Sequence, residues 1–211
     1  MKIEDLIKKR VAIAEKRILE LTKSDNLKNL SDKERFQISG FYEEKSRNRL
    51  ETAKLVLSAS KSNDKKRLEL NEDYRDYAEA VSAAYYSMYY IVHAFLALNY
   101  RKKLKEDIRG VHIITEYIIL YYLVKTKKLA RHLYEEYLAA LETASRIQNI
   151  DIESFQREAY EYVRKYDQNR TARETFTYKV TPDIEEHNAK KAVKTSEEFI
   201  NTIRQLMALR S

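Results

Sequence analysis

Residues 80–100 read AVSAAYYSMYYIVHAFLALNY and contain no Asp, Glu, Lys or Arg. A helix of this length could cross a bilayer. The segment also carries five Tyr, two Ser, His93 and Asn99, whose polar groups make insertion into lipid costly. A helix buried on all sides of a soluble bundle has a similar composition, because no side of it faces water. The segment therefore predicts a central core helix, and we expect no membrane association.

The rest of the composition predicts an all-α fold. The 211 residues include two Gly and one Pro, too few for the turns that an all-β protein needs. Charged residues make up 35% of the chain, against roughly 25% in an average domain, as expected for long helices with solvated faces. The same charge bias, together with the absence of Cys, favours a thermophilic source.

Several kinds of chemistry are excluded by residue type. Without Cys the chain has no disulfide, thiolate metal site or cysteine nucleophile. The isolated Gly40 and Gly110 cannot form a phosphate-binding loop, and none of the four His lies in a metal-binding pattern. We therefore expect no metal and no other cofactor. Charges interrupt Met1–Glu15, so no signal peptide is recognisable, and we expect a cytoplasmic protein.

The spacing of apolar residues predicts where the helices lie. Ser31 and Glu34 have the form of a capping box before the second helix. Thr181 is a favourable N-cap for the last helix, and Pro182 suits its first position. The predicted helices cover residues 1–24, 31–60, 72–100, 111–124, 129–147 and 152–165, with a last helix that starts at residue 182.

Three of these helices carry a stripe of apolar residues that predicts core positions. The stripe of the first helix must be buried, either across the bundle or on a partner. The predicted core positions are Ile3, Ile7, Val11, Ala14, Ile18 and Leu21 in the first helix, Phe41, Leu50, Ala53 and Leu57 in the second, and Ala189, Ala192, Ser196, Phe199, Ile203 and Leu206 in the last.

Four tyrosines, Tyr85, Tyr86, Tyr89 and Tyr90, form a broad stripe on the central helix. Such a stripe favours a core position or a dimer seam, and stacking of nucleic-acid bases is the alternative. His93 lies on the same apolar helix, which favours a core histidine over a catalytic one. The helix carries more large apolar residues than we expect one small bundle to cover, so we predict a homodimer.

The charge balance points to a polyanionic partner. Forty Lys and Arg against 33 Asp and Glu give a net charge of +7, which favours RNA through its phosphates. In an up-and-down bundle, the basic connections 61–67 and 125–131 and the entry to the last helix should lie at one end. That end would also suit an acidic protein. It would gather Lys65, Lys66, Arg67, Lys127, Lys128, Arg170 and Arg173.

An ordered set of motifs runs through residues 41–211. In chain order they are Leu50-x-x-Ala53-x-x-x-Leu57, Ala84-Tyr85-Tyr86-Ser87-Met88-Tyr89, Gly110-Val111-His112, Arg170–Tyr178 and Ala192-x-x-x-Ser196-x-x-Phe199-Ile200. Together they resemble the HEPN family (higher eukaryotes and prokaryotes nucleotide-binding domain). The resemblance implies an antiparallel up-and-down four-helix bundle over 41–211. Residues 1–40 would be a helical extension, and short helices would precede the last bundle helix.

The resemblance also implies a function. Many HEPN proteins are metal-independent ribonucleases of toxin–antitoxin or defence systems, and they commonly dimerise through their central helices. Their motif is Arg, four to six residues, then His, often followed by x-Tyr. In that chemistry Arg stabilises charge on the phosphate and His assists proton transfer. Some relatives pair with a nucleotidyltransferase that modifies the Tyr of the motif.

This chain departs from the motif at one position. Arg170, Arg173 and Tyr178 match it, but Phe176 stands where the His is expected, and phenylalanine cannot exchange a proton. We therefore expect an RNA-associated protein with weak or absent ribonuclease activity. One alternative is a non-enzymatic module that binds a nucleotidyltransferase. A second is an active ribonuclease that uses Arg170, Arg173 and Tyr178. The two arginines could also simply cap or bridge helices.

Overall fold

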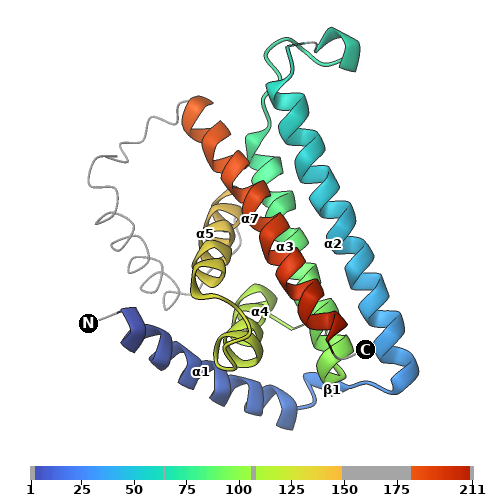
Figure 1. The fold of residues 1–211 in the computed structure, drawn as a ribbon, viewed down its shortest axis with the longest axis vertical. Coiled ribbons are helices and arrows are strands. Elements are labelled where there is room, and N and C mark those ends of the chain that lie inside the picture. The colour runs from blue at the N-terminus through green and yellow to red at the C-terminus, as the bar shows by residue number, and fades with distance from the viewer. Residues whose placement is uncertain (1–2, 64, 106–107, 149–181, 210–211) are drawn as a thin grey trace.

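The structure, a computed structural model, describes residues 3–63, 65–105, 108–148 and 182–209, and this part of the chain is mostly helical (Figure 1). The predicted helix over 152–165, the N-cap Thr181 and the motif residues Arg170, Arg173, Phe176 and Tyr178 lie outside the described residues. The elements are α1 (Ile3–Lys23), β1 (Leu27–Asn29), α2 (Asp32–Lys61), the 3₁₀ helix η1 (Lys66–Leu68), α3 (Tyr77–Tyr100), β2 (Lys102–Leu104), α4 (Val111–Ile119), the π-helix η2 (Leu120–Val124), α5 (Arg131–Gln148) and α7 (Pro182–Ala208).

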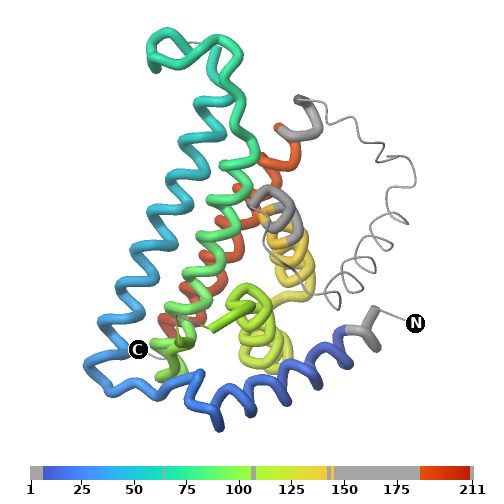
Figure 2. The backbone as a smooth tube through the Cα atoms, turned by 180° about the vertical axis from the view of Figure 1, so that it is seen from behind, coloured from blue at the N-terminus to red at the C-terminus, as the bar shows by residue number. Residues whose placement is uncertain are grey.

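Helix α3 is the centre of this arrangement. It packs against α2, α4, α5 and α7, while α1 crosses the end of the bundle where α3 finishes and packs on α4 and η2 (Figures 1 and 2). Helices α2 and α3 are antiparallel, since Ser46 bonds to Ser87 midway along them and Ser60 near the end of α2 accepts from the Asp76 amide at the start of α3. Helices α3 and α7 run parallel, because Tyr77 lies next to Glu186 at one end and Asn99 next to Leu206 at the other.

The start of α2 is set locally, as predicted. The Ser31 hydroxyl accepts from the Glu34 amide at 3.4 Å, and the Glu34 carboxylate accepts from the Ser31 amide at 2.8 Å. The capping box is therefore confirmed. Helix α3 begins later than predicted, at Tyr77, because Asp76 caps it by accepting from the Glu79 amide. Each cap satisfies backbone donors that the first helical turn leaves unpaired.

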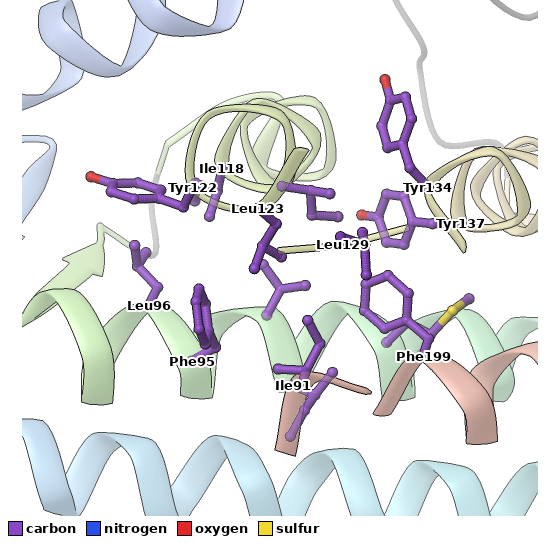
Figure 3. Close-up of a cluster of buried hydrophobic side chains, with 14 of the residues drawn as sticks. Ile91, Phe95, Leu96, Ile118, Tyr122, Leu123, Leu129, Tyr134, Tyr137 and Phe199 are labelled. Carbon is purple, nitrogen blue, oxygen red and sulfur yellow. The ribbon is translucent and has the colours of Figure 1, made fainter. Parts of the chain in front are cut away.

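The charge-free segment is a core helix, as predicted. By length and composition α3 could cross a membrane, and it is the one such helix in the described part of the chain. Most of its residues are buried inside the protein, so the core accounts for its apolar character. Figure 3 shows Ile91, Phe95 and Leu96 of α3 facing side chains from α4, η2, α5 and α7. One chain thus covers most of α3, so the apolar surface of this helix does not by itself require a second copy, and the homodimer stays a prediction.

Most predicted core positions are buried. Phe41 is the exception, because its side chain is 51% exposed on α2. The side chain of Ile3 lies outside the described residues, and Ile7, Val11, Leu57 and Leu206 are half-buried. The buried positions are Ala14, Ile18, Leu21, Leu50, Ala53, Ala189, Ala192, Ser196, Phe199 and Ile203.

The short antiparallel pair β1–β2 was not predicted. Leu27 of β1 lies opposite Leu104 of β2, and both side chains are buried. The pair joins the α1–α2 connection to the α3–α4 connection. It ties the N-terminal residues to the bundle, and the predicted boundary at residue 40 falls inside the continuous helix α2.

A buried ion pair fixes α1 on α4. The Arg10 guanidinium donates to the Glu116 carboxylate, and both side chains are almost fully buried. The Tyr134 hydroxyl donates to the same carboxylate at 2.6 Å. Ala14, Ile18 and Leu21 bury the apolar stripe of α1 in the main core. Most of the described part of the stripe is therefore covered by this chain itself.

We expect Arg10→Met to lower the free energy of unfolding by about 3–5 kcal/mol, because it leaves the Glu116 carboxylate buried without its cation. The double variant Arg10→Met with Glu116→Leu should recover part of that loss, since neither charge is then buried. Urea denaturation measures both values. The control is Arg17→Met, whose pair with Glu20 is exposed and should contribute less than about 1 kcal/mol. Equal losses for Arg10→Met and Arg17→Met would contradict the prediction.

Candidate functional site

The predicted basic end of the bundle is only partly formed. Lys65 is 4% exposed, and its ammonium donates to the carbonyls of Ser60 and Tyr74, so it closes the α2–α3 connection instead of facing solvent. Lys66 and Arg67 are exposed, and Lys66 lies 3.5 Å from Glu72. This end is shared with the start of α7, as the contact between Tyr77 and Glu186 shows.

The other basic connection lies at the opposite end of α3. The Lys128 ammonium donates at 2.8 Å to the hydroxyl of Tyr100, the last residue of α3, and Lys127 is exposed nearby. Helix α3 has 24 residues, so the two ends are about 36 Å apart. The prediction that both connections gather at one end is wrong. The helical segment 111–124 is too short to run back along the whole length of α3. The connection that follows it therefore lies beside the C-terminal half of α3 (Figure 1).

The structure instead brings aromatic and basic residues together between α2, α3 and the start of α4. They surround a solvent-open cavity of about 300 Å³. We call this the tyrosine pocket. Its lining is Phe41, Tyr42 and Lys45 from α2, Tyr86, Tyr89, Tyr90 and His93 from α3, Leu104 from β2, and Lys105, Val111 and His112.

The tyrosine stripe of α3 is divided between core and pocket. Tyr85 is fully buried, which confirms the core prediction for that residue. Tyr86, Tyr89 and Tyr90 are half-buried and line the pocket. Tyr90 stacks on Tyr42 with ring centroids 6.1 Å apart and meets Tyr89 edge-on at 5.2 Å. These contacts hold the rings in fixed orientations, with part of each ring open to a ligand.

Cations lie over the rings at the edge of the pocket. The Lys45 ammonium is 4.6 Å from the centre of the Phe41 ring and 5.4 Å from that of Tyr90. The Arg49 guanidinium is 5.8 Å from the Tyr86 ring. Attraction between a cation and an aromatic face favours both placements. Arg49 also pairs with Glu79 at 3.7 Å, whereas Lys45 has no carboxylate partner among the described residues.

His93 lies at the floor of the pocket and is 4% exposed. Its Nε2 is 2.9 Å from the Thr115 hydroxyl oxygen, and that hydroxyl donates to the Val111 carbonyl. Nε2 must therefore carry the hydrogen. Burial, with a smaller effect of the nearby His112, lowers the pKa of His93 to about 3. The imidazole is neutral at pH 7, as expected of a core histidine, and is too weak a base to accept a proton there.

His112 is half-buried at the start of α4, where its ring packs beside those of Tyr86 and Tyr89. Its Nδ1 lies 2.8 Å from the Tyr85 hydroxyl, and burial lowers its pKa. Burial also raises the pKa values of the Tyr86 and Tyr89 hydroxyls, so they stay protonated at neutral pH. The pocket therefore offers flat faces and neutral polar groups rather than a proton-transfer pair. The part of the chain that the structure describes contains no group of acidic and histidine residues that could hold a metal.

Sequence reasoning missed the pocket because it depends on how α2 and α3 are aligned. The spacing of Tyr86, Tyr89, Tyr90 and His93 places them on one side of α3. Nothing in that spacing tells which residues of α2 stand opposite. The aromatic pair at positions 41 and 42, followed by Lys45 at helical spacing, is a signal that could have suggested a second aromatic face.

No family model, curated protein or solved structure matches this chain. Its resemblance to the HEPN family stays a prediction. The function must therefore be inferred from the residues of the site.

Burial of His93 predicts a pH-dependent stability. An unfolded histidine has a pKa of about 6.5, so between about pH 6.5 and pH 3 the unfolded chain binds a proton that folded His93 excludes. Stability is full above that window and falls as the pH drops into it. We expect His93 to account for about 2 kcal/mol of the loss between pH 7 and pH 5, and His112 acts in the same direction.

Urea denaturation at the two pH values measures this loss, and His93→Gln should reduce it. The exposed His132→Gln variant should keep the pH dependence of the unaltered protein. The same pH dependence in His93→Gln as in the unaltered protein would show that His93 is not held neutral.

Proposed function

We propose that this chain is an RNA-associated, HEPN-like protein with weak or absent ribonuclease activity. The observation that carries the proposal is the tyrosine pocket, where partly open aromatic rings adjoin Lys45, Arg49 and Lys105. Proteins that bind single-stranded nucleic acids combine aromatic stacking faces with basic residues that follow the backbone. The net charge of +7 supports the same class of partner.

The course of the helices is compatible with a HEPN-like bundle. Antiparallel α2 and α3 and parallel α3 and α7 follow an up-and-down order if α4 and α5 form the third leg. The place in a toxin–antitoxin or defence system rests on the resemblance of residues 41–211 alone.

Weak or absent cleavage follows from the side chains that could act as a general base. Phe176 replaces the motif His, and buried His93 is neutral and a poor base at pH 7. Burial lowers the pKa of His112, which weakens it as a base. Neither histidine of the pocket therefore restores the acid–base pair that the family's reaction requires.

A second candidate function is a protein-interaction module, with a nucleotidyltransferase as one partner. Three large apolar side chains of α2 favour it, since Phe36, Phe41 and Leu55 are 54%, 51% and 69% exposed. Exposed apolar residues of this kind commonly mark contact surfaces when they are grouped. The homodimer remains part of the proposal, but its contact would use α2, because α3 is already covered.

We expect the protein to bind single-stranded RNA with an affinity that falls steeply as salt rises. Fluorescence anisotropy of a labelled oligoribonucleotide measures this. Arg170→Ala and Arg173→Ala should each weaken binding and lower the slope of log affinity against log salt by about 0.7 per lost phosphate contact. The control is Arg17→Ala on α1, which should match the unaltered protein. Absence of RNA binding, or binding indifferent to salt, would contradict the proposal and favour the interaction module.

Phe176→His tests the motif assignment. Because it restores the missing imidazole, we expect this variant to cleave RNA faster than the unaltered protein. Adding Arg170→Ala to it should abolish the gain, since the phosphate charge then loses its guanidinium. The readout is release of labelled fragments with a metal chelator present. Rapid cleavage by the unaltered protein, insensitive to Arg170→Ala, would show that the site is placed wrongly.

A further inference from the structure

We propose that the tyrosine pocket receives one unpaired nucleobase of single-stranded RNA, stacked against Phe41 and Tyr90, while Lys45 moves onto the adjacent phosphate. This inference rests on the proposed RNA association. It adds the subsite, its contacts and a preference for single strands over duplexes.

The exposed Phe41 ring is the first argument. Its helical spacing predicts a core residue, yet half of its surface faces solvent at the mouth of the pocket. It meets Tyr42 edge-on with centroids 5.4 Å apart, and Tyr42 in turn stacks on Tyr90. The exposed ring is thus held by a second aromatic residue. Such a ring gains most from a flat ligand, because stacking removes its exposed face from water.

The size of the pocket sets how much ligand enters it. A cavity of about 300 Å³ is at the lower end of the range for small-molecule sites. It accommodates a single base with part of its sugar, and the neighbouring nucleotides would remain outside. Bases in a duplex are stacked and paired inside the helix, so an unpaired base is the form that can enter.

Lys45 supplies the charge complementarity. Its ammonium lies over the Phe41 and Tyr90 rings, and among the described residues it has no carboxylate partner. The entering base needs these same faces. A lysine side chain is long and flexible, so it can leave the rings and follow the base's phosphate. The cation–ring contact of an exposed lysine is weak and is readily exchanged for a phosphate contact.

The wall beside the rings offers a polar contact for the edge of the base. His112 uses Nδ1 toward Tyr85, and its Nε2 has no hydrogen-bond partner in the part of the chain that is described. The imidazole edge of a neutral histidine can pair with a donor or acceptor on a base. Aromatic faces accept any base, so His112 is the group that would prefer one base over another.

The test uses a short uridine-rich oligoribonucleotide with one central 2-aminopurine, whose fluorescence changes when it stacks on an aromatic ring. The full chain should change this fluorescence on binding the single strand, and should bind the matching duplex more weakly. Phe41→Leu should weaken binding by about fivefold or more, the lower end of the cost of losing one stacked base. It should also reduce the fluorescence change, since only the Tyr90 ring is then left for stacking.

The matched control is Phe36→Leu. Phe36 lies on the same helix, is similarly exposed at 54%, and has Arg35 over its ring at 4.4 Å, but it does not line the pocket. This variant should bind as the unaltered protein does. Both phenylalanines are on the surface, so circular dichroism should show each variant folded.

Three results would overturn the inference. Salt-dependent binding that is equal in Phe41→Leu, Phe36→Leu and the unaltered protein, without a fluorescence change, removes the subsite and leaves RNA association standing. No RNA binding by the unaltered protein removes both. A dimer that Phe41→Leu converts to a monomer, with RNA binding unchanged, assigns the pocket to a contact between copies of the chain.

Discussion

The burial of one charge-free helix is the constraint on which the rest of the structure depends. From Ala80 onward helix α3 carries no charged residue and most of its side chains are buried, so α2, α4, α5 and α7 must enclose most of it. Its two halves are covered differently. The N-terminal half carries Ala80, Ala83 and Ala84, which meet Ala189 and Ala192 of α7 in a tightly packed seam. The C-terminal half carries larger residues, and α4 and η2 fill the wider space beside it (Figure 3).

The tyrosine pocket is the place where this enclosure is incomplete. Between the seam and the start of α4, the hydroxyl-bearing rings of α3 are long enough to reach the surface beside α2. A tyrosine can serve both environments, because its ring packs against the core and its hydroxyl reaches water. The same helix therefore provides the core and the candidate binding surface. Substitutions on the buried side of α3 would disturb both, whereas Phe41 and Lys45 on α2 can be changed with little effect on the core.

What could be predicted from the sequence was determined locally. The capping box of Ser31 and Glu34 and the apolar stripe of α7 follow from spacing and side-chain chemistry alone. The predictions that failed concern residues whose surroundings are set by segments far away in the sequence. Phe41 shares the helical spacing of core residues but lines a pocket. Lys65 belongs to a basic stretch, yet it is buried and donates to the carbonyls of Ser60 and Tyr74. Composition showed that the apolar side chains of α3 need to be buried. It could not show that the other helices of the same chain bury most of them.

The small β1–β2 pair has a consequence for the order of folding. Pairing Leu27 with Leu104 in an unfolded chain would close a very long loop, at a high cost in chain entropy. Once α2 and α3 have formed their antiparallel hairpin, the two segments are brought together at its open end, and closure requires little further ordering. We therefore expect the hairpin to form first and the pair to close afterwards. Helix α1 is attached beyond that closure, so we expect it to dock onto α4 only after the hairpin has formed.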